Sequence, residues 1–113
     1  MLKMLERAAG LSLTGQSDRK YRFGAIGIRS DGATVYATNG GIAGAQCPSA
    51  HAESRLSRKL DVSSVVFVAR TLRSSGAVSM ARPCLGCQLA MKHRGIAKCY
   101  YTINDREFGC IYF

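Results

Sequence analysis

The spacing of apolar positions predicts a helix at the start of the chain. Over residues 1–9, Leu2, Leu5 and Ala9 recur on one face of a helix, with charged side chains between them. Gly10 follows at once, and glycine commonly ends helices because it adopts the left-handed conformation that closes the last turn. The pattern therefore predicts an amphipathic helix that ends at Gly10.

The next segments change from helical to extended periodicity. Residues 21–29 are rich in β-branched and aromatic side chains, and residues 33–38 continue this pattern. Between them stands Ser30-Asp31-Gly32, a strong turn signal. These features predict two antiparallel strands joined as a hairpin.

The rest of the chain alternates between helical and extended segments. Residues 64–69 are apolar on both faces, which is typical of a strand in the middle of a sheet. The order of elements predicts an α/β fold, a three-layer α-β-α sandwich with a mixed sheet of about five strands. The elements expected after the hairpin are a helix over 48–60, the strand over 64–69, a polar connection over 70–82, a helix over 84–94 closed by Gly95, a strand over 98–103, a turn at Asn104-Asp105 and a strand over 108–113.

Length and composition indicate one globular domain. The chain has 113 residues, of which 47% are hydrophobic and 20% charged, so we expect a single domain over residues 1–113. No apolar run approaches the roughly 20 residues that a membrane span needs, and charged side chains interrupt the N-terminus too often for a signal peptide. The expectation is a soluble, cytoplasmic protein that has no contact with a membrane.

The chain is strongly basic. Sixteen Lys and Arg residues against seven Asp and Glu give a formal net charge of +9, which is typical of proteins that bind polyanions. The basic residues are scattered rather than gathered in a run, so they predict a folded basic face and not a basic tail. Single-stranded nucleic acid is one partner that this charge allows, and a small phosphorylated substrate is another.

Cysteine and histidine residues form the chemically distinctive pattern. The chain has five cysteines, an odd number, which does not suit a disulfide scaffold. Cys84 and Cys87 are three residues apart at the start of a predicted helix, where both side chains can reach one ion. His51 and Glu53 fall in the first turn of the other predicted helix, and both helix starts follow strands of the sheet.

One imidazole and two thiolates suit zinc and leave its fourth position open for water. Zinc lowers the pKa of such a water toward about 7, and a neighbouring carboxylate can take its proton and return it to a leaving group. We therefore expect His51, Cys84 and Cys87 to bind Zn²⁺ and Glu53 to be the catalytic residue of a hydrolytic site.

The combination His51-x-Glu53 and Pro83-Cys84-x-x-Cys87 resembles the signature of the zinc-dependent cytidine and deoxycytidylate (CMP/dCMP-type) deaminase superfamily. The resemblance spans the whole chain. In the stretches over residues 79–84 and 100–103, the chain is also similar to small stand-alone members of the superfamily in bacteriophage genomes.

This resemblance implies the cytidine deaminase fold and the conversion of cytosine to uracil in a nucleoside or nucleotide, with zinc-bound hydroxide attacking C4 and Glu53 shuttling protons. It also implies substrate contacts at Asn39, with Ala52 and Arg82 as further candidates, a homo-oligomer, and a host-cytoplasmic location if the protein is phage-encoded.

Several alternatives stay open. The enzyme could act on cytosine in single-stranded DNA or RNA or, as a minority option, on adenine, and a non-catalytic zinc-binding module belongs to a different functional class. Cys47 could close a four-ligand structural site, whereas Cys99 and Cys110 fit packed strand positions. The remaining assignments are a solvated His93, one ring of Tyr100-Tyr101 on each sheet face, and Arg70, Arg73 and Arg82 in the connection near the pocket, where they could contact phosphate.

Overall fold

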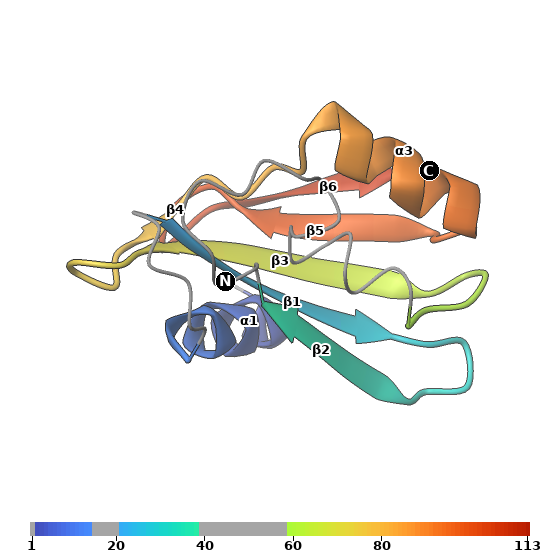
Figure 1. Cartoon of the computed structure of the whole chain (residues 1–113), viewed down its shortest axis with the longest axis horizontal. Coiled ribbons are helices and arrows are strands. Elements are labelled where there is room, and N and C mark those ends of the chain that lie inside the picture. The colour runs from blue at the N-terminus through green and yellow to red at the C-terminus, as the bar shows by residue number, and fades with distance from the viewer. Residues whose placement is uncertain (1, 15–20, 39–58) are drawn as a thin grey trace.

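The computed structural model describes residues 2–14, 21–38 and 59–113, and Figure 1 shows their arrangement. Within these ranges the chain is an α/β structure with one mixed sheet of six strands and two helices. The elements are α1 (Lys3–Leu13), β1 (Tyr21–Ile28), β2 (Thr34–Thr38), β3 (Val65–Leu72), β4 (Val78–Ser79), α3 (Leu85–Arg94), β5 (Lys98–Thr102) and β6 (Phe108–Tyr112). Neither of these helices is long and apolar enough to cross a membrane.

The strand order places one parallel pair near the centre of the sheet. The order is β2-β1-β3-β5-β6, and the short β4 pairs with β3 beside this path. β1 is antiparallel to both β2 and β3, and β6 is antiparallel to β5. β3 and β5 are parallel, and α3 lies in the connection between them. The mixed sheet is thus confirmed, and so are the hairpin of β1 and β2 and the central position of β3.

The two helices pack on opposite faces of the sheet. On one face, Ala8 and Ala9 of α1 pack against Ile26 and Ala69. On the other face, Met91 of α3 joins the larger core cluster, whose buried members are Ala25, Leu60, Val66, Val68, Ala81, Met91, Ile96, Cys99 and Tyr101. The helix expected over 48–60 lies outside the described residues except for Lys59 and Leu60, which are not helical; Leu60 instead packs into this core.

The first helix is longer than predicted. It continues through Gly10 and ends at Leu13, because residues beyond Gly10 also contact the sheet. Ser12 is fully buried, and its hydroxyl donates to the carbonyl of Ala9 at 2.6 Å and lies 2.6 Å from the hydroxyl of Thr71 in β3. Tertiary contacts therefore override the glycine signal, and Thr14 takes over the C-cap position.

The connection predicted over 70–82 contains structure that the sequence pattern did not indicate. β3 extends to Leu72, and β4 pairs back onto it, with Arg70 opposite Ser79 and Thr71 opposite Val78. The turn between them is closed by the N–H of Gly76, which donates to the carbonyl of Leu72 at 2.8 Å. The polar connection predicted over 70–82 is thus partly extended, because its first residues belong to β3 and β4 pairs with them.

A carboxylate ties the β1–β2 turn to the segment before β3. Asp61 accepts hydrogen bonds from the hydroxyl of Ser64 at 2.6 Å, from the hydroxyl of Ser30 at 2.9 Å and from the backbone N–H of Ser30 at 3.2 Å. Arg29 lies 3.8 Å away. These groups, the Ser64 hydroxyl first, lower the pKa of Asp61 from 3.8 to about 2.

We expect this carboxylate to make unfolding pH-dependent. Because the pKa of Asp61 is lower in the folded state, its contribution to stability is present above about pH 4 and is lost as the pH falls toward about 2. Asp61→Asn should flatten the pH dependence of the urea unfolding midpoint in this window. Asp105→Asn, at an exposed aspartate between β5 and β6, is the control. Equal slopes in wild type and Asp61→Asn would contradict the expectation.

Candidate functional site

The site is built around the start of α3. Cys84 is the N-cap residue, with extended backbone angles (φ −65°, ψ 163°), and the helix runs from Leu85 to Arg94. The carbonyl of Cys84 accepts the first helical hydrogen bond from the N–H of Gln88 at 2.9 Å. The side-chain amide of Gln88 donates back to the carbonyl of Pro83 at 2.8 Å, which fixes the Pro83-Cys84 segment on the helix. The predicted helix start is therefore confirmed to within one residue.

The two cysteines of this segment occupy different environments. Cys84 is exposed, whereas Cys87 is fully buried within the first turn of α3. Gly86 lies between them, and a Cβ atom added there would lie 4.0 Å from Cys84 Sγ, so that sulfur lies beside the first helical turn. Two sulfur donors at this helix start, one reached from solvent and one on the core side, fit a zinc site in their chemistry.

The sheet holds this segment at the ends of its parallel strands. The N–H of Ala81 donates to the carbonyl of Thr102 at 2.8 Å, and the hydroxyl of Thr102 donates to the carbonyl of Ser79 at 2.8 Å. Because Thr102 is the last residue of β5, the chain leading to Cys84 passes the carboxyl end of that strand. Ligands of open α/β sheets bind at this end.

Arg82 is positioned beside the cysteine segment by a tyrosine of β5. Its guanidinium Nη1 donates to the hydroxyl oxygen of Tyr101 at 3.2 Å, and its central carbon lies 5.8 Å from the centroid of the Tyr101 ring. Tyr101 is 8% exposed, whereas Arg82 is exposed. The Tyr101 ring packs directly over Gly109 of β6, where no side chain would fit. Tyr101 was not among the expected site residues, although strand alternation places it on the face of Cys99.

A second arginine lies on the same sheet face at the end of β3. Arg70 Nε donates to the hydroxyl of Ser79 at 3.0 Å, and its guanidinium lies 5.8 Å from the centroid of the Phe23 ring. Of the three arginines assigned to the connection, Arg70 is thus a strand residue, whereas Arg73 and Arg82 lie outside strands and helices. Positive charge is therefore present at the carboxyl end of the parallel pair.

The other residues of the predicted zinc site lie outside the described residues. These are His51, Glu53, Asn39, Ala52 and the alternative ligand Cys47. Within the part of the chain that is described, no group of three or more His, Cys, Asp or Glu side chains could hold a metal ion. The ligand set and the proton-transfer role therefore stay predictions. Of the predicted site residues, the structure describes the ligands Cys84 and Cys87 and the candidate substrate contact Arg82.

Three further assignments can be compared with the structure. Cys99 is fully buried in the core cluster of the α3 face, which confirms a packed position. Cys110 is only half-buried in β6, and His93 is exposed in the last turn of α3, as expected for a solvated side chain. Tyr100 and Tyr101 are neighbours in β5, so their side chains lie on opposite faces of the sheet.

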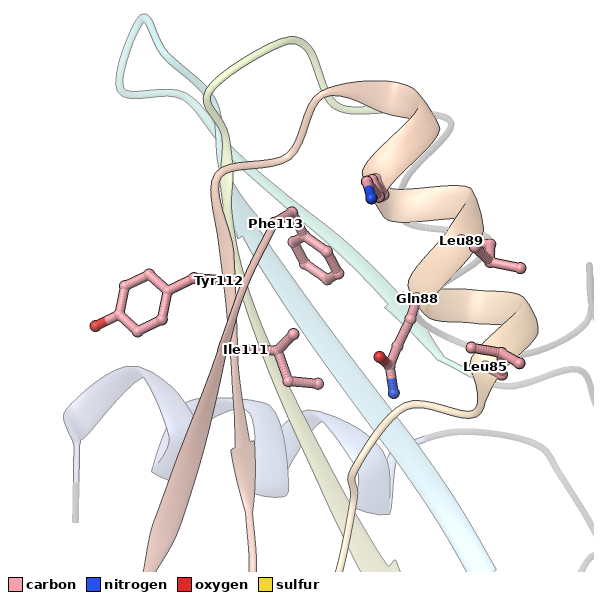
Figure 2. Close-up of a pocket in the computed structure, with 7 residues that line it drawn as sticks. Leu85, Gln88, Leu89, Ile111, Tyr112 and Phe113 are labelled. Atoms are coloured by element: carbon pink, nitrogen blue, oxygen red, sulfur yellow. The ribbon is translucent and has the colours of Figure 1, made fainter.

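A shallow groove of about 280 Å³ runs between α3 and β6, as Figure 2 shows. Ile111 and Phe113 point from the strand side toward the helix, and the Gln88 side chain extends into the groove. Leu85 and Leu89 border it and are 70% and 58% exposed. Neither Cys84 nor Cys87 lines this groove.

The described part of the site thus unites a two-cysteine helix start with an arginine held over a buried tyrosine, at the carboxyl ends of β3 and β5. No protein-family model matches the chain, and no curated protein matches its sequence.

Proposed function

We propose that this protein is a zinc-dependent hydrolytic deaminase that converts cytosine to uracil in a nucleoside or nucleotide. The observation that carries the proposal is the position of Cys84 and Cys87 at the start of α3, at the carboxyl ends of a parallel strand pair. The sequence adds His51-x-Glu53 earlier in the chain, and this combination resembles the deaminase signature.

In this proposal the residues divide into three roles. His51, Cys84 and Cys87 hold Zn²⁺. When bound, the ion would activate a water molecule by lowering the pKa of that water. Glu53 accepts a proton from the water and delivers it to the departing amino group. The C4–oxygen bond forms, the C4–nitrogen bond breaks, and ammonia leaves. Asn39, Ala52 and Arg82 contact the substrate.

Two measurements test the proposal together. Metal analysis of the purified protein should find about one zinc per chain, because three ligands from one chain bind one ion. Deamination of deoxycytidine, dCMP and a cytosine-containing oligonucleotide should then be followed side by side by ammonia release. Turnover of deoxycytidine or dCMP, lost on chelation and restored by zinc, is the expected result. No turnover of any of the three substrates by zinc-loaded protein would overturn the proposal.

The net charge of +9 favours one second candidate, a deaminase that acts on cytosine in single-stranded DNA or RNA. Turnover of the oligonucleotide alone would select this candidate. In that case the affinity of the protein for the oligonucleotide should fall steeply with salt, because each phosphate contact releases counterions. Nucleoside turnover would depend much less on salt, since an uncharged substrate displaces few ions.

The hydroxyl of Tyr101 provides a test of the role of Arg82. Tyr101→Phe keeps the buried ring but removes the acceptor that lies 3.2 Å from the guanidinium. If Arg82 contacts substrate, we expect KM to rise by about fivefold with little change in kcat, as for the loss of one hydrogen bond of about 1 kcal/mol. Tyr36→Phe is the matched control, because the Tyr36 hydroxyl accepts a bond from Arg7 at 3.0 Å on the other face of the sheet. Unchanged KM in Tyr101→Phe would contradict this role.

A further inference from the structure

The described elements cover the sheet face opposite α3 only in part. In the β5–β6 hairpin, Lys98 pairs with Tyr112, Tyr100 with Cys110 and Thr102 with Phe108, so these side chains share one face. It is the face on which α1 packs, since Cys99, Tyr101 and Ile111 point to the α3 side. α1 packs mainly against β1 and β3 and has few contacts with β5. Figure 1 shows α1 on the side of the sheet away from β6. Within residues 2–14, 21–38 and 59–113, no helix therefore covers the hairpin end of this face.

Aromatic rings gather on this part of the face. Phe67 and Tyr100 stack with ring centroids 5.2 Å apart and planes 11° from parallel, and Phe108 meets Tyr100 edge-on at 6.1 Å. Phe108 is 39% exposed and Tyr112 is 76% exposed. Figure 2 shows the Tyr112 ring pointing away from α3 and the groove. We call Phe67, Lys98, Tyr100, Phe108 and Tyr112 the aromatic platform.

The platform also carries a positive charge. Lys98 Nζ lies 5.1 Å from the centroid of the Tyr100 ring, a cation–π distance. A hydrogen bond with the Tyr100 side chain raises the pKa of Lys98 above its ordinary value of 10.5. Lysine is protonated at neutral pH even at that ordinary value. Phe67 is buried and Tyr100 half-buried, so the platform presents the exposed rings of Phe108 and Tyr112 beside a cation.

We propose that the aromatic platform binds single-stranded nucleic acid, with bases stacked on its rings and a phosphate beside Lys98. Exposed aromatic side chains on a sheet surface stack two or three unpaired bases, whereas the bases of a duplex are already stacked on one another. Phe108 and Tyr112 lie four residues apart on β6, which separates them by about 13 Å and leaves room for two or three bases.

Charge distinguishes this occupant from a second copy of the chain. A second copy would bring another net charge of +9 and another Lys98 to the same surface, and both would repel. A polyanion is complementary to the whole chain and to this patch. The platform lies on the sheet face opposite α3, so its occupation is independent of the proposed deaminase activity.

Fluorescence anisotropy with a labelled 12-nucleotide oligothymidylate tests the proposal, because this probe contains no cytosine and cannot be a deamination substrate. Tyr112→Ala and Phe108→Ala should each weaken binding by at least about fivefold, as expected for the loss of one stacked base. Leu89→Ala removes an exposed apolar side chain from α3 and should leave the affinity unchanged. Thermal unfolding of each variant confirms that it is folded.

The charge is tested separately from the rings. Lys98→Ala should lower the slope of log K against log salt by about 1, whereas Tyr112→Ala should keep the wild-type slope. Lys92→Ala, at an exposed lysine of α3, is the control. Wild-type affinity in folded Tyr112→Ala and Phe108→Ala would overturn the proposal. The proposal would also be overturned if sedimentation showed a wild-type dimer that Tyr112→Ala dissociates while the affinity for oligothymidylate stays the same.

Discussion

Replacing Glu53 with glutamine is expected to lower the deamination rate by about 10²- to 10⁴-fold, the range that general acid–base catalysis contributes. Glutamine has nearly the shape of glutamate but cannot accept a proton from water at neutral pH. Because Glu53 is not among the proposed zinc ligands, the variant should retain zinc and the wild-type unfolding temperature. Rate, zinc content and thermal unfolding are therefore measured on the same preparation.

Glu6→Gln is the matched control for this change, because Glu6 is an exposed glutamate in the first turn of α1. It should retain full activity. Glu53→Gln protein that binds zinc and deaminates at the wild-type rate would refute the proton-transfer role and would favour a non-catalytic zinc-binding module. Variants of Cys84 or Cys87 discriminate less well, since the loss of a ligand can unfold a domain together with its metal site.

The sequence pattern predicted the regular elements with long periodic signals. The buried strand β3 and the helix α3 closed by Gly95, which adopts φ 85°, follow from local chemistry alone. The missed features depend on contacts distant in sequence. β4 has only two residues and exists because it pairs with β3. The extension of α1 beyond Gly10 depends on the buried contact of Ser12 with Thr71.

The candidate site shows the same division. The sequence predicted a helix start at Cys84, and the structure places Cys84 at the N-cap. The hydrogen bond from Arg82 to Tyr101 could not be predicted in this way, because it depends on the register that sets Tyr101 opposite Gly109. Only a residue without a side chain leaves space for the Tyr101 ring there, so β6 contributes to the position of an arginine beside the cysteines.

The close approach of α1 to the sheet leads to the largest expected effect on stability. Gly24 of β1 is buried beneath α1, and a Cβ atom there would collide with the carbonyl oxygen of Ala8 and would lie 2.7 Å from the backbone nitrogen of Ser12. Both atoms belong to the helix backbone, so no rotation of a side chain can relieve the contact. In Gly24→Ala the helix must move away from the sheet, which also disturbs the buried hydroxyl pair of Ser12 and Thr71.

We expect Gly24→Ala to lower the free energy of unfolding by about 3 kcal/mol, the upper part of the usual range for overpacked cores, and to lower Tm by about 10 °C or more. Gly10→Ala is the control, since a Cβ atom at this exposed helical position meets no atom within 4 Å. That change should raise stability by about 0.5–1 kcal/mol, because alanine loses less backbone entropy in a helix. Urea unfolding of both variants measures the two changes in the free energy of unfolding, which should have opposite signs. A Gly24→Ala protein as stable as wild type would mean that α1 does not pack on β1 at this distance. It would then contradict the packing of α1 on this face of the sheet.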